Sequence, residues 1–293
     1  MSFFLLLRLS FWPASPSSVL IYALIIFWPF FLAGPIFAGI FYYHSRQISK
    51  LYGADLIGAA IGTISFLFLL KLWGGEISVF FSGVSAAAAG FLLSLRKQGD
   101  DLPKQRTFSL GAGLVLIINF GIFALFLSNP KAVKLPLGQN PDKQSYVVLK
   151  KDSPLGEVIE TRWSSFGRTD LVKLSKLPEI MIVYLDGTAG SPMLYFEGNL
   201  EKINPVVKNL IINTPGFFPF FFLSENEKDT LLSIGPGGGR DVLLALWGKV
   251  KQIEAVEVNP DIVSLTRKYS WFNGGIFSSF NNFSYVFTYI SNS

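Results

Sequence analysis

The stretch Leu231-Leu232-Ser233-Ile234-Gly235-Pro236-Gly237-Gly238-Gly239-Arg240-Asp241 decides the fold of the second half of this chain. Its apolar start is typical of a buried strand. The glycines that follow permit positive φ angles and a close approach of the backbone to other groups. The apolar run Val242–Trp247 then predicts a helix that ends at Gly248. The order strand, glycine loop, helix predicts the beginning of a parallel βαβ unit.

A second strand is predicted over Gln252–Val258, with an acid near its end. Asn259 and Pro260 are a good N-cap and first residue for the helix that follows. An acid at the tip of the second strand can accept hydrogen bonds from both hydroxyls of a ribose, and it is expected about 20 residues after the glycines. The sequence therefore predicts a nucleoside site made by Gly235, Gly237, Gly238, Gly239 and Glu257.

The glycine spacing narrows the kind of nucleoside. The dinucleotide pattern G-x-G-x-x-G, counted from Gly235, requires glycine at position 240, where this chain has Arg240. Glycines at 235, 237 and 239 are instead typical of a site for adenosylmethionine, in which no pyrophosphate is bound. The competing interpretation is a tight strand-to-helix turn beside a surface acid.

Composition excludes several classes of protein. Half of the 293 residues are hydrophobic and only 15% are charged, whereas an average soluble protein is about 25% charged. The chain has no cysteine, and His44 is its only histidine. These counts exclude disulfides, thiolate zinc sites and cysteine nucleophiles, and we expect no metal site. No basic stripe with interleaved aromatic residues is present, so we expect no nucleic-acid partner.

Charge separates a membrane half from a water-soluble half. Residues 1–130 carry only 12 of the 45 charged side chains. A membrane-spanning helix needs about 20 apolar residues, and residues 1–127 are predicted to form a membrane domain with four such helices, at 19–43, 55–73, 77–95 and 108–127. The lipid bilayer is thus a partner. Lysine and arginine number six on one side and five on the other, which leaves orientation open.

The remaining chain is predicted to contain a linker, 128–145, a small β-rich domain, 146–222, and a partial Rossmann-like domain, 223–293. The short β-type runs of the middle domain are Tyr146–Lys150, Gly156–Trp163, Thr169–Lys173, Ile180–Leu185 and Met193–Phe196. A short helix is expected over Asn204–Asn213, and a third strand of the last domain over Phe283–Ile290. The fold class is therefore a multi-spanning helical membrane domain, a small antiparallel β-domain and an incomplete α/β Rossmann-like domain.

Three stretches resemble the spermidine-synthase-like proteins with an N-terminal membrane domain, within the adenosylmethionine-dependent methyltransferase superfamily. They are residues 51–62 (LYGADLIGAAIG), residues 184–190 (YLDGTAG), and residues 234–241 (IGPGGGRD) together with 256–260 (VEVNP). The resemblance implies transfer of an aminopropyl group to a small amine. The alkyl donor is then decarboxylated adenosylmethionine, or adenosylmethionine itself for a methyltransferase. Because adenosyl cofactors are made in the cytoplasm, we expect an inner or plasma membrane protein whose soluble half faces the cytoplasm.

Two departures from that family leave the catalytic residues unknown. The soluble aminopropyltransferases have a His-Glu pair, absent from residues 193–197, and a glutamine near the position of Gly190. The later strands with the catalytic acid are also missing, so we expect a truncated and inactive chain. The acids Asp170, Asp186 and Glu197 are interpreted as turn or surface residues. A membrane transporter and a non-catalytic nucleoside-binding membrane protein remain alternatives, and the oligomeric state stays open.

Overall fold

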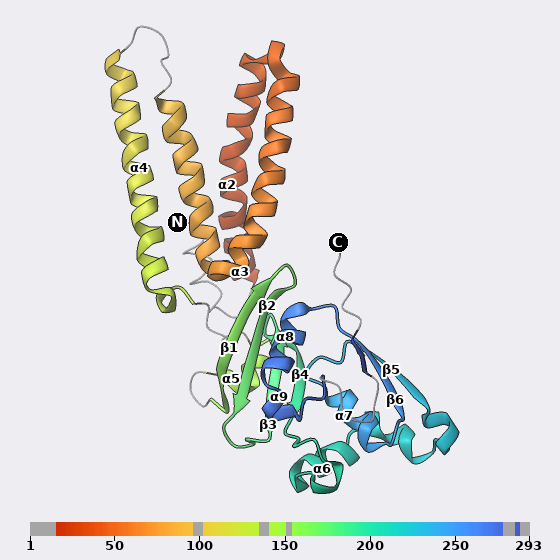
Figure 1. The fold of residues 1–293 in the computed structure, drawn as a ribbon. Coiled ribbons are helices and arrows are strands. Elements are labelled where there is room, and N and C mark those ends of the chain that lie inside the picture. The colour runs from red at the N-terminus through yellow and green to blue at the C-terminus, as the bar shows by residue number, and fades with distance from the viewer. Residues whose placement is uncertain (1–15, 96–101, 135–140, 151–153, 278–284, 288–293) are drawn as a thin grey trace. The chain divides into compact units, whose positions relative to one another are not determined.

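A computed structural model describes residues 16–95, 102–134, 141–150, 154–277 and 285–287. The chain divides into two compact units, Met1–Pro136 and Leu137–Ser293. The first unit is helical, and the second contains two β-sheets with helices packed against them (Figure 1).

In its described residues, the helical unit has three long helices: α2 (Pro16–Tyr43), α3 (Ile48–Ser94) and α4 (Leu102–Ser128). Short 3₁₀ turns, η1 (Ser45–Gln47) and η2 (Pro130–Ala132), follow α2 and α4. Within the part of this unit that the structure describes, three segments are long and apolar enough to cross a membrane, namely Val19–Tyr43, Ser45–Ser94 and Arg106–Ser128. Their composition indicates association with a membrane.

Helix α3 contains two of the four predicted segments, 55–73 and 77–95. Its 47 residues would extend for about 70 Å if straight, more than twice the roughly 30 Å of hydrocarbon in a bilayer. The helix instead breaks at Gly74, whose φ of 79° and ψ of 170° are not helical. The two arms of α3 consequently run in opposite directions (Figure 1). Glycine suits this position because a positive φ is costly for other residues.

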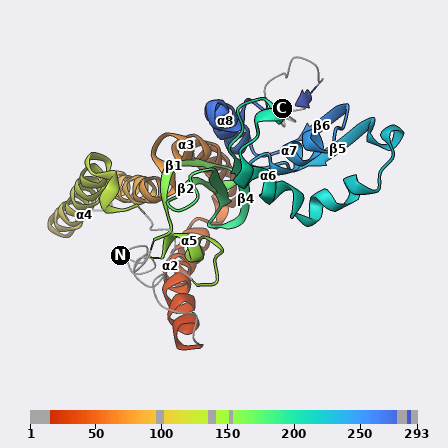
Figure 2. The same cartoon turned by 90° about the horizontal axis from the view of Figure 1, so that it is seen from below.

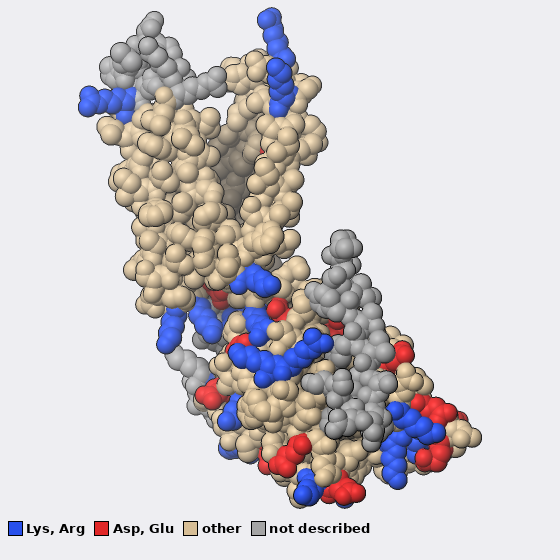
Figure 3. All heavy atoms as spheres, viewed as in Figure 1, with Lys and Arg blue, Asp and Glu red and all other residues tan. Residues whose placement is uncertain are grey.

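At the break and beyond it, α3 packs against α4 through aromatic side chains. Trp73, Phe81 and Phe123 lie within 5.7 Å of one another, measured between ring centroids, and Phe80 contacts Phe126. Elsewhere the helices expose large apolar residues, such as Phe30 at 73%. On the face seen in Figure 3, this unit is almost free of charge between the helix ends, where lysine and arginine side chains lie. Such a continuous apolar surface is not stable in water.

The first sheet of the second unit is an antiparallel meander in the order β1-β2-β3-β4. Its strands are β1 (Gly156–Ser164), β2 (Gly167–Leu174), β3 (Ile180–Leu185) and β4 (Thr188–Leu194). Asp186 and Gly187 join β3 to β4, and both have positive φ angles, 50° and 73°. Asp-Gly is a preferred pair for this two-residue hairpin turn. The interpretation of Asp186 as a turn residue is therefore confirmed.

The predicted strand Tyr146–Lys150 is wrong, because this segment forms a short helix, α5 (Ser145–Leu149). Tertiary contacts override its β-type composition. The amide of Ser145 donates to the carbonyl of Gly187 at 2.9 Å, and the carbonyl of Val148 accepts the amide of Leu155 at 2.8 Å. The predicted strand Met193–Phe196 is also displaced, since β4 begins at Thr188 and ends at Leu194.

The second sheet is parallel, in the order β5-β6-β7 within the described residues. Its strands are β5 (Thr230–Ile234), β6 (Gln252–Val256) and β7 (Tyr285–Phe287), and the rest of the predicted strand Phe283–Ile290 lies outside the described residues. The helices are α6 (Pro205–Ile212), α7 (Arg240–Trp247), α8 (Pro260–Lys268) and α9 (Ser270–Asn273). Ile234 is 80% exposed at the end of β5, which is the outer strand of this sheet in the described part of the chain.

Helix α7 lies against β5 and β6 (Figure 1, Figure 2). Its apolar side Val242–Leu246 is buried with Ile253 and Ala255 of β6 and with Leu194 and Phe196 at and beyond the end of β4. A second cluster joins Leu171, Met181 and Met193 of the first sheet to Leu265 and Phe272 of the last helices. The two sheets of this unit are thus connected by apolar packing, which holds the first sheet beside the glycine loop.

Candidate functional site

The glycine loop, residues 235–239, connects the end of β5 to the start of α7. Gly235, Gly237 and Gly239 all have positive φ angles, 68°, 57° and 92°. Gly239 is the N-cap of α7. The backbone conformation therefore explains why glycine occurs at every second position. Residues with positive φ are needed at 235, 237 and 239 to reverse the chain direction between strand and helix.

Glu257 lies directly beside this loop, as the sequence predicts for its partner acid. One carboxylate oxygen, Oε2, accepts the amide of Gly237 at 3.2 Å, and the other, Oε1, accepts the amide of Asn259 at 2.9 Å. The residue is only 5% exposed. The structure therefore brings Glu257 and Gly237 together, and the acid is a buried part of the loop, not a surface residue.

Protein atoms occupy the space that a side chain would need at three of the four predicted glycines. A Cβ atom at Gly237 would collide with Ser191, one at Gly238 would lie 2.5 Å from the carbonyl oxygen of Pro192, and one at Gly239 would collide with Ile276. Among the four, only Gly235 has no heavy atom of the described residues within 4 Å of that position. Three of these glycines consequently permit close packing inside the protein, and Gly235 faces open space.

Every amide N–H of the loop has an acceptor within the protein. The amide of Gly235 donates to Val256 O at 2.8 Å, and that of Gly239 donates to Pro236 O at 2.9 Å. The amide of Gly237 is bound by Glu257, and that of Gly238 donates to Ser191 Oγ at 2.9 Å. Proline at 236 has no N–H. The loop therefore does not present the row of free donors that binds phosphate in nucleotide sites.

The first sheet contributes residues that the sequence did not point to. Ser191 of β4 reaches the loop from 47 positions away, and Thr169 of β2 accepts the side-chain amide of Asn259 at 3.2 Å. Asn259 also caps α8, because its Oδ1 accepts the amide of Asp261 at 3.0 Å. The amide of Gly190 donates to Gln144 Oε1 at 2.8 Å. Apart from the local cap of α8 by Asn259, these pairings have no local sequence pattern, because each joins distant parts of the chain.

Of the three acids that the sequence analysis interpreted as turn or surface residues, Asp170 and Glu197 differ in burial. Asp170 is fully buried, so its interpretation as a turn or surface residue is wrong. It faces Arg168, with Nε and Oδ2 2.9 Å apart, and accepts Thr161 Oγ1 at 2.6 Å. Glu197 is exposed, as expected, and accepts the hydroxyl of Tyr195 at 2.6 Å. This hydrogen bond raises the pKa of Tyr195.

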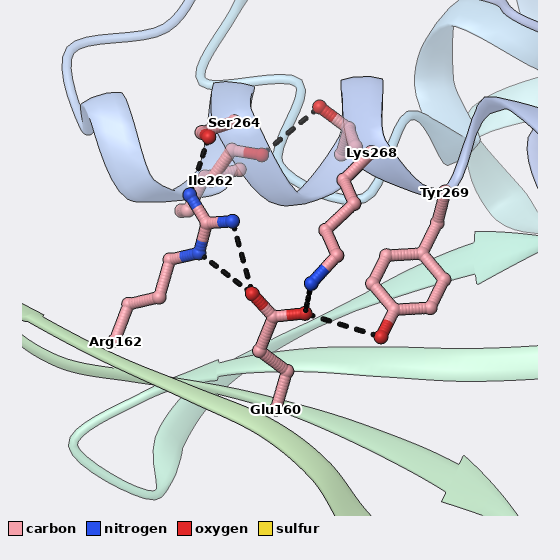
Figure 4. Close-up of polar contacts among 7 residues, drawn as sticks. Glu160, Arg162, Ile262, Ser264, Lys268 and Tyr269 are labelled. Atoms are coloured by element: carbon pink, nitrogen blue, oxygen red, sulfur yellow. Dashed lines mark hydrogen bonds and ion pairs between the residues drawn. The ribbon is translucent and has the colours of Figure 1, made fainter.

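A polar cluster fixes α8 to β1 (Figure 4). The carboxylate of Glu160 accepts hydrogen bonds from Arg162 at 2.9 Å and 3.0 Å, from Lys268 at 2.7 Å and from Tyr269 at 3.1 Å. Arg162 also donates to Ser264. Burial raises the pKa of Glu160, but the hydrogen bonds from Lys268, Arg162 and Tyr269 outweigh burial and hold the pKa below 4.5.

This cluster matters for the site because of where α8 begins. The helix starts at Pro260, three residues after Glu257, and its N-cap Asn259 binds both Glu257 and Thr169. Contacts that hold α8 against the first sheet therefore also fix the backbone that carries Glu257.

We compared the chain with known protein families and with curated proteins. No protein family model matches the chain, and no curated protein matches it significantly.

Proposed function

We propose that this chain is a membrane-bound, spermidine-synthase-like protein whose second unit binds an adenosylmethionine-type nucleoside. The observation that carries the proposal is the buried carboxylate of Glu257, hydrogen-bonded to the glycine loop between β5 and α7. The parallel order β5-β6-β7 supports a Rossmann-like arrangement, in which ligands bind at the carboxyl ends of the strands.

The residues at this edge of the sheet fit a ribose and a purine. A carboxylate has about four acceptor positions, and Glu257 uses two of them on backbone amides. Two remain for the hydroxyls of a ribose. Val258, the next residue, is 54% exposed and offers an apolar surface to a purine ring. The amide of Gly235 donates to Val256, the residue that precedes Glu257, so Gly235 lies next to this strand end. No heavy atom of the described residues lies within 4 Å of a Cβ position at Gly235.

Alkyl transfer to an amine is the reaction that we propose, with aminopropyl transfer ahead of methyl transfer. A bound adenosyl sulfonium supplies an electrophilic carbon next to its sulfur. The contribution of this chain is to hold the nucleoside through Glu257 and Val258, and so to fix the direction in which that carbon points. We assign no catalytic base, because Asp170 is buried against Arg168 and Asp186 is occupied in a hairpin turn.

The helical unit is proposed to anchor this activity in a membrane. Its three long apolar helices support insertion, and the two arms of α3 together with α2 and α4 provide four passages. An adenosyl ligand is available only where it is made, so the proposal includes an inner or plasma membrane location with the second unit in the cytoplasm.

Binding of 5′-methylthioadenosine to the full chain in detergent tests the proposal. Glu257→Ala removes two charged-acceptor hydrogen bonds to ribose, each worth about 1.5–3 kcal/mol, so we expect affinity to fall by at least about a hundredfold. Glu197→Ala removes an exposed carboxylate of the same unit and serves as the matched control. Equal affinity in Glu257→Ala and wild type would remove the assignment.

A further inference from the structure

We propose that Ser191 makes the glycine loop select nucleosides that carry no phosphate, an inference that rests on the proposed function. Ser191 lies on β4, at the edge of the first sheet, and its hydroxyl oxygen accepts the amide of Gly238 at 2.9 Å. That amide lies one residue before the N-cap of α7, the position at which glycine loops bind phosphate.

Ser191 is the removable acceptor of the loop. The amides of Gly235 and Gly239 donate to backbone carbonyls, which no substitution can delete. Glu257 binds the amide of Gly237 but is also the proposed ribose ligand. Ser191 alone among these acceptors is a side chain brought from the other sheet, and its replacement frees one amide without touching the βαβ unit.

The same side chain also occupies space over the loop. A Cβ atom at Gly237 would collide with Ser191 Oγ and would lie 2.7 Å from Ser191 Cβ. A phosphate approaching the amides of Gly237 and Gly238 therefore meets both a filled volume and a donor already in use. The negative charge of Glu257 opposes phosphate as well, but it is the same in wild type and in any Ser191 variant.

Two ligands that differ at the 5′ position test this role. 5′-Methylthioadenosine carries a neutral thioether, and adenosine 5′-monophosphate carries a phosphate. We expect the wild-type chain in detergent to bind the thioether at least about tenfold more tightly. Ser191→Gly removes the acceptor of the Gly238 amide and the side-chain atoms beside Gly237, while the backbone of Pro192 stays next to Gly238. Affinity for the monophosphate should therefore rise about tenfold, while affinity for the thioether changes less than about threefold.

Two further variants separate the causes. Ser191→Ala removes the acceptor but keeps the Cβ, so its gain in monophosphate affinity should be smaller than that of Ser191→Gly. Ser164→Gly is the matched control, because Ser164 also accepts a backbone amide, that of Phe166, at the end of β1. Circular dichroism establishes that each variant is folded.

The outcomes distinguish this inference from the proposed function. A wild-type chain that fails to bind 5′-methylthioadenosine contradicts the proposed function. The role of Ser191 is overturned if wild type binds both ligands equally, or if Ser191→Gly gains no more monophosphate affinity than Ser164→Gly. It is also overturned if folded Ser191→Gly binds neither the monophosphate nor inorganic phosphate, whether or not wild type binds the nucleoside.

Discussion

Replacing Asp170 by asparagine should destabilise the first sheet severely. Asp170 is fully buried in the middle of β2, and the side chain of its partner Arg168 is 5% exposed. The substitution preserves shape but removes the charge that balances the guanidinium. Breaking a buried ion pair in this way costs about 3–5 kcal/mol, because a charge is then left in a medium of low dielectric constant.

An exposed ion pair provides the matched control. Lys251 and Asp229 are closer, with Nζ and Oδ1 2.6 Å apart, but their side chains are 64% and 60% exposed. Solvent screens such a pair, so Asp229→Asn should change the stability very little. The comparison separates burial from distance, and we expect burial to determine the energy.

Hydrogen–deuterium exchange of the full chain in detergent measures both variants. Exchange of β2 and β3 amides reports the free energy of local opening. Asp170→Asn should accelerate exchange there about a hundredfold or more, and Asp229→Asn less than about tenfold around β5. The double variant Arg168→Met with Asp170→Leu should restore most of the protection, since apolar replacements of buried pairs are often neutral. Equal acceleration by the two asparagine variants would refute the reasoning.

Three other outcomes follow from single features. Gly239→Ala should destabilise the second unit by about 1–3 kcal/mol, because the φ angle of Gly239 is 92° and an added Cβ would collide with Ile276. Gly235→Ala should destabilise it less, because the Cβ at that position enters open space. Thermal unfolding of the two variants measures the difference. Because the pKa of Glu160 is lower in the folded protein, its contribution to stability is complete above pH 4.5 and is lost as the pH falls through the folded pKa. Glu160→Gln should therefore flatten the acid side of a stability–pH curve. An unchanged curve would contradict the assignment. Residues 228–251 should resist protease in sealed right-side-out vesicles, and cleavage there would place the second unit outside.

The βαβ unit could be predicted from sequence because its local signals agree with one another. Asn259 and Pro260 are typical of a helix start, and they begin α8 in the structure. The strand, loop, helix and strand between Thr230 and Val256 likewise follow the predicted order. Tyr146–Lys150 failed for the opposite reason. Its β-type residues are a weak local preference, and hydrogen bonds to Gly187 and Leu155 hold the segment in a helix.

The environment of the loop could not be predicted, because it comes from other parts of the chain. Gly238 is bounded by Ser191 and Pro192 of β4, and Gly239 by Ile276 after α9. Neither contact has a periodicity or a spacing that a sequence displays. The burial of Asp170 was missed for the same reason. Arg168 and Asp170 are two residues apart on β2 and so lie on the same face of the sheet, a spacing that charged pairs on exposed strands also have.

The structure also changes what the glycine pattern can mean. Two interpretations of residues 235–239 competed at the level of sequence, a nucleoside site and a tight strand-to-helix turn. Gly237, Gly238 and Gly239 are required by packing alone, because protein atoms fill the space at each of them. Glycines that face protein carry no information about a ligand. The case for a nucleoside therefore rests on Gly235, the one loop glycine with open space, and on Glu257, whose carboxylate keeps acceptor positions after binding two amides.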